Sequence, residues 1–110
     1  MQEMNRKEKI KYIAEYFGLA QEQKIIEEAG ELITELSRLQ QQVMLVALGK
    51  AETDDREIKR MMNDVILEMV DVDILIHQLI HIYDAEEEFE EGIDYKLDRT
   101  IKRIENGYYK

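Results

Sequence analysis

The chain has 110 residues, of which 45% are apolar and 36% charged, so one soluble folded domain is expected rather than a disordered segment. Its formal net charge of −10 argues against binding to a nucleic-acid polymer or to an anionic membrane surface. The absence of cysteine excludes disulfide bonds and thiolate metal sites, and the absence of proline favours long, uninterrupted helices.

The first half of the chain predicts two helices. Residues 6–17 place apolar side chains on one face, and Gly18 follows as a natural stop. Residues 21–48 repeat Ile, Leu and Ala with a period close to 3.6, and this second helix is expected to end at Gly49. Both patterns indicate amphipathic helices that pack on a partner element.

The second half predicts two more helices after a polar turn. Asp54 is a suitable N-cap for a third helix over residues 55–83. The acidic run at residues 84–92 is expected to form a solvated helix end or a loop. A fourth, shorter helix is predicted over residues 94–104, with Gly107 closing it. The expected fold is therefore an all-α bundle of about four helices, in a single domain covering residues 1–110.

The third helix is apolar around nearly its whole circumference between residues 65 and 82. This stretch is long enough to span a membrane, but Glu68, Asp71 and Asp73 interrupt it, and each acid costs about 2.5–3.5 kcal/mol near the bilayer centre. A buried helix is the better interpretation. One small bundle cannot surround such a helix, so we expect an obligate homo-oligomer, a dimer or a dimer of dimers. The N-terminus lacks a signal-peptide pattern, so the expected location is cytoplasmic.

Two pairs of acidic residues lie within the most apolar segments. Glu28 and Glu31 belong to the second predicted helix, and Glu68 and Asp71 to the third. A spacing of i, i+3 places each pair on one helical face. A lone glutamate on a helix is usually solvated, but no lysine or arginine occurs between residues 61 and 95 to neutralise the second pair. Four clustered carboxylates predict a site for Mg²⁺, with Mn²⁺ as a substitute.

The order of these acids resembles a known family. The pattern EExxE, here Glu27, Glu28 and Glu31, followed by ExxD, here Glu68 and Asp71, is similar to that of the all-α nucleoside triphosphate pyrophosphohydrolases, the MazG-like group. The likeness extends over residues 16–104. It implies Mg²⁺-dependent hydrolysis of a (deoxy)nucleoside triphosphate to the monophosphate and pyrophosphate. It also implies a catalytic role for the EExxE acids, and metal binding by the last two of them together with the ExxD pair.

The fourth predicted helix carries a basic stripe. Lys96, Arg99 and Arg103 follow the spacing i, i+3, i+7 and therefore share a face. One interpretation is a solvated face that pairs with the acidic run before it. The other, which the family resemblance favours, is a clamp on the substrate phosphates. Gln21 is a candidate contact to the nucleoside.

Two other functional classes fit parts of the sequence. A noncatalytic helical oligomerisation or regulatory protein with an acidic interface is the main alternative. A carboxylate-bridged redox bundle is less consistent, because His77 and His81 lack the acid three residues earlier that such sites use. The pyrophosphohydrolase hypothesis leaves the base open, with dUTP, dCTP and damaged nucleotides as candidates.

Overall fold

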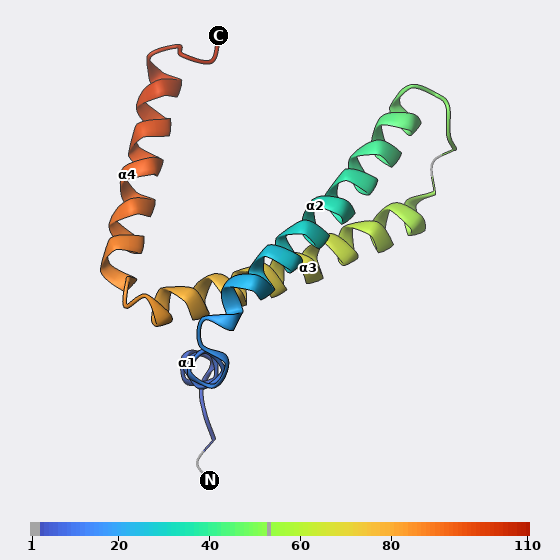
Figure 1. Ribbon diagram of the computed structural model, residues 1–110. Coiled ribbons are helices and arrows are strands. Elements are labelled where there is room, and N and C mark those ends of the chain that lie inside the picture. Colours follow the sequence, from blue (N-terminus) through green and yellow to red (C-terminus); the bar gives the residue numbers. More distant parts are fainter. Residues whose placement is uncertain (1–2, 53) are drawn as a thin grey trace.

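The computed structural model describes residues 3–52 and 54–110. Its helices are α1 (Arg6–Phe17), α2 (Ala20–Ala47), α3 (Asp55–Ile82) and α4 (Glu86–Glu105) (Figure 1). These four helices account for all the regular secondary structure of the described residues, which confirms the all-α prediction. No helix in residues 3–52 or 54–110 is both long and apolar enough to cross a membrane.

The end of α1 and the start of α3 follow from local chemistry that the sequence predicted. Gly18 ends α1 with φ of +59°, a backbone conformation that side chains with a Cβ rarely adopt. Asp54 caps α3, because its carboxylate accepts hydrogen bonds from the backbone N–H groups of Arg56 and Glu57 at 3.0 and 3.3 Å. The start of α3 is therefore fixed by the predicted cap.

The fourth helix begins earlier than the sequence predicted. It starts at Glu86 rather than at residue 94, so the acidic run forms the first turns of the helix, which is the helix end of the two expected forms and not the loop. Three glutamates occupy its first turn, where negative charge interacts favourably with the positive end of the helix dipole. Lys102 and Arg103 occupy the last turn, where the opposite charge is favoured. This charge order stabilises a longer helix than the apolar pattern alone indicates.

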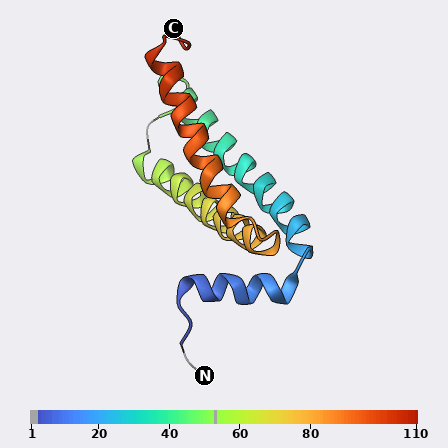
Figure 2. The same cartoon turned by 90° about the vertical axis from the view of Figure 1, so that its left-hand side faces the viewer.

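The helices do not form a closed bundle. The α2 and α3 helices pack side by side as a long hairpin, and α1 lies across its base against α3 (Figures 1 and 2). Within the described residues α4 contacts only α3, and it diverges from the hairpin like the second arm of a V (Figure 1). The radius of gyration is 18.6 Å, whereas a compact chain of this length has about 13 Å.

The hydrophobic core is correspondingly small. The buried apolar residues are Ala14 of α1 and Val65, Leu75 and Ile80 of α3. No large side chain of the described residues is fully buried. The α3 helix, which is apolar around most of its circumference, is therefore covered only on the sides that face α1 and α2. On its other sides Ile66, for example, remains 50% exposed.

Candidate metal centre between α2 and α3

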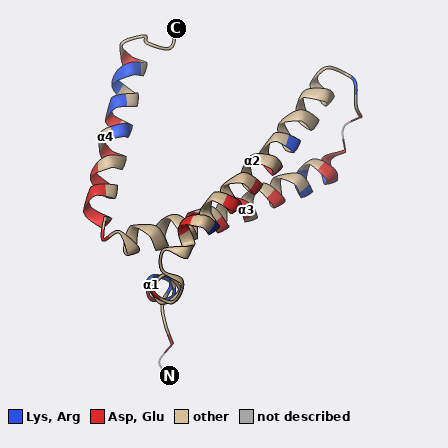
Figure 3. Ribbon diagram, in the orientation of Figure 1, with Lys and Arg blue, Asp and Glu red and all other residues tan. Residues whose placement is uncertain are grey.

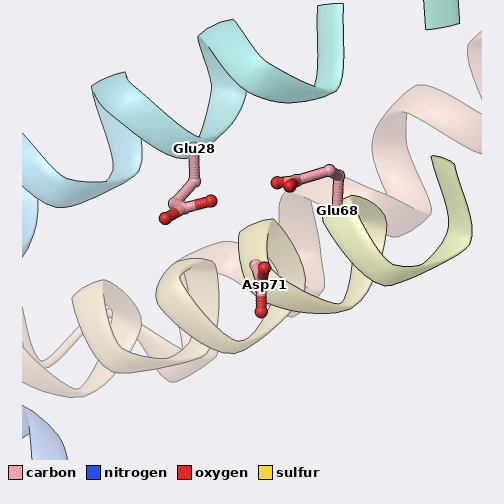
Figure 4. Close-up of side chains that lie close together, drawn as sticks. All are labelled: Glu28, Glu68 and Asp71. Atoms are coloured by element: carbon pink, nitrogen blue, oxygen red, sulfur yellow. The ribbon is translucent and has the colours of Figure 1, made fainter. Parts of the chain in front are cut away.

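Three carboxylates converge where the α2–α3 hairpin is closely packed. Glu28 points from α2 toward α3, and Glu68 and Asp71 extend from α3 toward it (Figure 4). One carboxylate oxygen from each residue lies within 4.8 Å of the others. Glu68 and Asp71 meet Glu28 together because residues three apart share a helical face. The structure thus brings together acids that are forty residues apart in the sequence.

Glu68 is the acid with the least favourable environment for charge. Its Oε2 atom is buried and has no hydrogen-bond partner among the described residues. Burial, followed by the neighbouring Glu28 carboxyl and the charge of Glu31, raises the pKa of Glu68 to about 7. The negative charge of Asp71 acts in the same direction. In the metal-free protein Glu68 therefore carries a proton for a large part of the time near neutral pH.

Glu28 is in a different electrostatic situation, although it is only 9% exposed. The ammonium group of Lys24 lies 3.1 Å from its Oε1, and this ion pair lowers the pKa of Glu28 below its usual range. Lys24 itself is half exposed and can turn toward solvent without losing a buried contact. Of the two closely spaced acids, Glu28 therefore ionises first, and Glu68 retains its proton to higher pH.

The chemistry of this donor set fits a hard divalent cation. All three groups offer carboxylate oxygens, the ligands that Mg²⁺ and Mn²⁺ prefer. A cation would supply the partner that Glu68 Oε2 lacks and would stabilise its ionised form. Asp71 is exposed, but the burial of Glu28 and of Glu68 Oε2, together with repulsion among the acids, makes the protein alone a poor environment for three negative charges. The site is therefore a candidate metal centre.

The other two acids of the EExxE pattern lie beside this trio. Glu31 is outside the converging group, but it is close enough for its charge to affect Glu68. Glu27 and Glu31 are exposed and line a groove of about 440 Å³ that Glu68 also lines. The groove is lined by Glu27, Gly30, Glu31, Thr34, Glu35, Arg38 and Glu68. A molecule in this groove would contact the acidic centre directly.

Arg38 is a candidate site residue that the sequence analysis missed. It is the single basic residue lining the groove in the described part of the chain, and it pairs with Glu35 at 3.2 Å. Its side chain is 64% exposed, so it can exchange this partner for a ligand. The sequence did contain a signal for Arg38, because this residue follows Glu31 by seven residues and so lies on the same face of α2.

The basic stripe and the candidate nucleoside contact lie elsewhere. Lys96, Arg99 and Arg103 lie in the second half of α4, whereas acidic residues occupy its first half (Figure 3). The structure does not bring this stripe to the acidic centre, since α4 has no contact with α2 among the described residues. Gln21 is buried and donates a hydrogen bond from Nε2 to Oε1 of Gln78 at 2.6 Å. In this chain it joins the start of α2 to α3.

No protein-family model, curated protein or solved structure matches the chain. The likeness to MazG-like pyrophosphohydrolases therefore rests on the two acidic motifs and on the elements that carry them. The geometry of Glu28, Glu68 and Asp71 is independent of that likeness, because it follows from the packing of α2 against α3.

Proposed function

We propose that the chain is a Mg²⁺-dependent hydrolase that converts a (deoxy)nucleoside triphosphate to the monophosphate and pyrophosphate. The observation that carries the proposal is the convergence of Glu28, Glu68 and Asp71 around a buried carboxylate oxygen without a partner. The order of the acidic motifs along the chain supports it. A divalent cation also explains how a protein of charge −10 would bind a polyanionic substrate.

Each acid has a role that follows from its position. Glu28, Glu68 and Asp71 would hold Mg²⁺, with Glu31 beside them as a further ligand. Bound Mg²⁺ supplies neutralisation of phosphate charge and lowers the pKa of a coordinated water. Glu27, exposed on the wall of the groove, would orient a water molecule or accept its proton.

The groove suits a nucleotide in both size and chemistry. Its volume of about 440 Å³ lies within the range of small-molecule sites. The metal centre at one end would bind the phosphates. Arg38, farther along α2, would donate hydrogen bonds to a phosphate oxygen or to the edge of the base. This arrangement makes Arg38 a substrate-binding residue and the acids the catalytic machinery.

The active form is proposed to be a homodimer or a dimer of dimers. The chain exposes large apolar side chains on α2, α3 and α4, including Ile33 at 65% and Leu67 at 63%. The same exposure is what the alternative function, a noncatalytic helical oligomerisation protein, would require. Both functions involve self-association, so self-association does not separate them. They differ in whether the acidic centre turns over a substrate.

The decisive experiment is a pyrophosphate-release assay across the common ribo- and deoxyribonucleoside triphosphates with Mg²⁺ or Mn²⁺. We expect monophosphate and pyrophosphate as products, identified by chromatography, and loss of turnover in Glu68→Gln. Glu52→Gln, which changes an exposed loop acid away from the groove, is the matched control and should retain wild-type rates. Absence of turnover with both metals, together with self-association, would favour the noncatalytic alternative.

A further inference from the structure

The acidic centre has one basic side chain against it in the described part of the chain. Lys24, on α2, places its ammonium group 3.1 Å from Oε1 of Glu28, and no other ion pair of the described residues involves the three converging carboxylates. The negative charges of Glu27 and Glu31 act on the same ammonium group. Lys24 therefore neutralises part of the charge that the packing of α2 on α3 concentrates at this point.

This ion pair contributes little to the stability of the α2 helix. Lys24 precedes Glu28 by four residues, and a pair with the acid on the N-terminal side would stabilise a helix better. The Lys24 side chain is 52% exposed, whereas that of Glu28 is 12% exposed. Packing therefore holds the acid in place, and the exposed ammonium group can exchange partners at low cost. The geometry makes Lys24 a movable cation beside a fixed carboxylate.

Lys24 replaces a divalent cation only in part. Its ammonium group contacts one of the three carboxylates, and Glu68 Oε2 has no hydrogen-bond partner among the described residues. A divalent cation carries twice the charge and can contact several carboxylate oxygens at once. An ammonium group a few ångströms from such a cation is repelled, and the Lys24 side chain is free to turn away. The two cations are therefore expected to exclude each other at Glu28.

Two basic side chains flank the acids along α2. Lys24, Glu31 and Arg38 follow one another at intervals of seven residues, so they share a helical face. Lys24 is four residues from Glu28, about 6 Å along the helix axis, whereas Arg38 is ten residues from it, about 15 Å. The groove extends on the Arg38 side of the acids, and Lys24 is not among its lining residues. The short side suits compact phosphate groups, and the grooved side suits the larger nucleoside.

We propose that Lys24 is a tethered counter-ion: it pairs with Glu28 while the acidic centre holds no metal, leaves it when a divalent cation binds, and then binds the pyrophosphate part of the substrate. The inference rests on the proposed function and deepens it, because it fixes the direction of the substrate along α2. The nucleoside then lies toward Arg38, in the groove, and the leaving pyrophosphate lies toward Lys24. A lysine ammonium group suits this role because it is a mobile point charge for phosphate oxygens.

Titration with Mn²⁺ alone measures the competition at Glu28. Lys24→Met should bind Mn²⁺ roughly two- to fivefold more tightly than the wild type, since no ammonium group then competes for this carboxylate. Lys24→Arg, which keeps a cation at the position, should bind like the wild type. Lys50→Met changes the net charge equally at the tip of the hairpin and is the matched control. Equal affinity of Lys24→Met and the control would overturn the inference.

Acylation of lysine amines by an N-hydroxysuccinimide ester, followed by peptide mass spectrometry, tests whether Lys24 is released. An amine that is paired with a carboxylate stays protonated and reacts slowly. We expect the rate at Lys24 to rise roughly two- to fivefold when Mg²⁺ is added, and to fall again when pyrophosphate is added with Mg²⁺. Lys50 is the internal reference and should react at a constant rate. An unchanged rate at Lys24 on addition of Mg²⁺ would mean that its pair with Glu28 persists, which would overturn the inference.

The direction of the substrate is tested with its two product halves in saturating Mg²⁺. Lys24→Met should weaken the binding of pyrophosphate by at least about tenfold and leave the binding of the common deoxyribonucleoside monophosphates unchanged. Arg38→Ala should weaken the binding of the monophosphates and leave that of pyrophosphate unchanged. Isothermal titration calorimetry measures both affinities without turnover. Any other distribution of the losses between the two variants would overturn the assigned direction.

Failure of this inference differs from failure of the proposed function. If no triphosphate is hydrolysed while Lys24→Met binds Mn²⁺ more tightly, the exchange at Glu28 is retained and the reaction is removed. If triphosphates are hydrolysed while neither Mn²⁺ affinity nor product binding responds to Lys24→Met, the reaction is retained and the role of Lys24 is removed.

Discussion

The α2–α3 hairpin and α4 both combine apolar stripes with dense charge, yet their environments differ. In the hairpin the two helices pack on each other, bury Glu28 and shield one carboxylate oxygen of Glu68 from solvent. In α4 the apolar residues from Ile93 onward are exposed, as are Lys96 and Arg99, and among the described helices α4 contacts only α3. The same residue types therefore produce a centre of closely spaced, mutually repelling acids in one region and an exposed surface without a partner in the other.

The largest predicted effect removes the acidic centre. Glu68→Gln and Asp71→Asn should each lower kcat/KM by more than about 100-fold, since loss of a residue that only orients a metal ligand already costs 10–100-fold. Circular dichroism should show unchanged helicity, because the amide has the size of the acid. Retained turnover in both variants would place the chemistry outside the hairpin.

A smaller effect on activity is predicted for substitution of the basic side chains. Arg99→Ala and Arg38→Ala should each lower kcat/KM by roughly 10–100-fold, the value of one or two hydrogen bonds to a charged phosphate. Steady-state kinetics separates them from Lys110→Ala, an exposed change at the C-terminus that should have no effect. If Arg38→Ala alone were silent, the α4 stripe would be the main phosphate contact.

The stabilisation of the fold by Mg²⁺ should be lost when the acidic centre is disrupted. Mg²⁺ is expected to raise the melting temperature of the wild type with increasing concentration, because it binds the folded chain and relieves repulsion among the acids. Glu68→Gln should show only the small change produced by the same ionic strength of NaCl. An equal response of both proteins to Mg²⁺ would mean that the ion acts by screening alone.

The sequence predicted the elements better than their arrangement. Helical periodicity, the stop at Gly18 and the N-cap Asp54 identified α1 to α3, because these signals are local. The start of α4 was missed, since an acidic run in which Phe89 is the only large apolar residue gives no periodic signal, although its charge stabilises a helix N-terminus. The position of α4 away from the hairpin depends on tertiary contacts, which no local pattern records.

The site was predictable to a similar extent. Spacing identified Glu28, Glu68 and Asp71, since acids three residues apart on an apolar helix are costly to bury unless a cation neutralises them. Arg38 was missed because a lone arginine on an amphipathic helix is usually solvated, although its register with Glu31 placed it on the same face. Gln21 illustrates the reverse case, since a polar residue near the motif is engaged with Gln78.

The smallest predicted effect concerns pH and tests the electrostatic contrast directly. The pKa of Glu68 is about 7 in the folded chain against an ordinary value of 4.5, so the folded state binds its proton more tightly than the unfolded state between these values. Stability falls with pH wherever the folded state binds more protons. The metal-free wild type should therefore lose stability as pH rises from about 5 to 8, measured by urea unfolding.

Glu68→Gln isolates this contribution, because the glutamine does not titrate while both histidines remain in each protein. The difference in unfolding free energy should favour the variant increasingly toward pH 8. Glu28 does not disturb the comparison, since Lys24 lowers its pKa and it is already ionised across this range. Saturating Mg²⁺ should reverse the trend in the wild type, because the ion binds the deprotonated acid and competes with the proton. A parallel pH profile in the two metal-free proteins would place Glu68 in contact with solvent, where its carboxylate needs no cation.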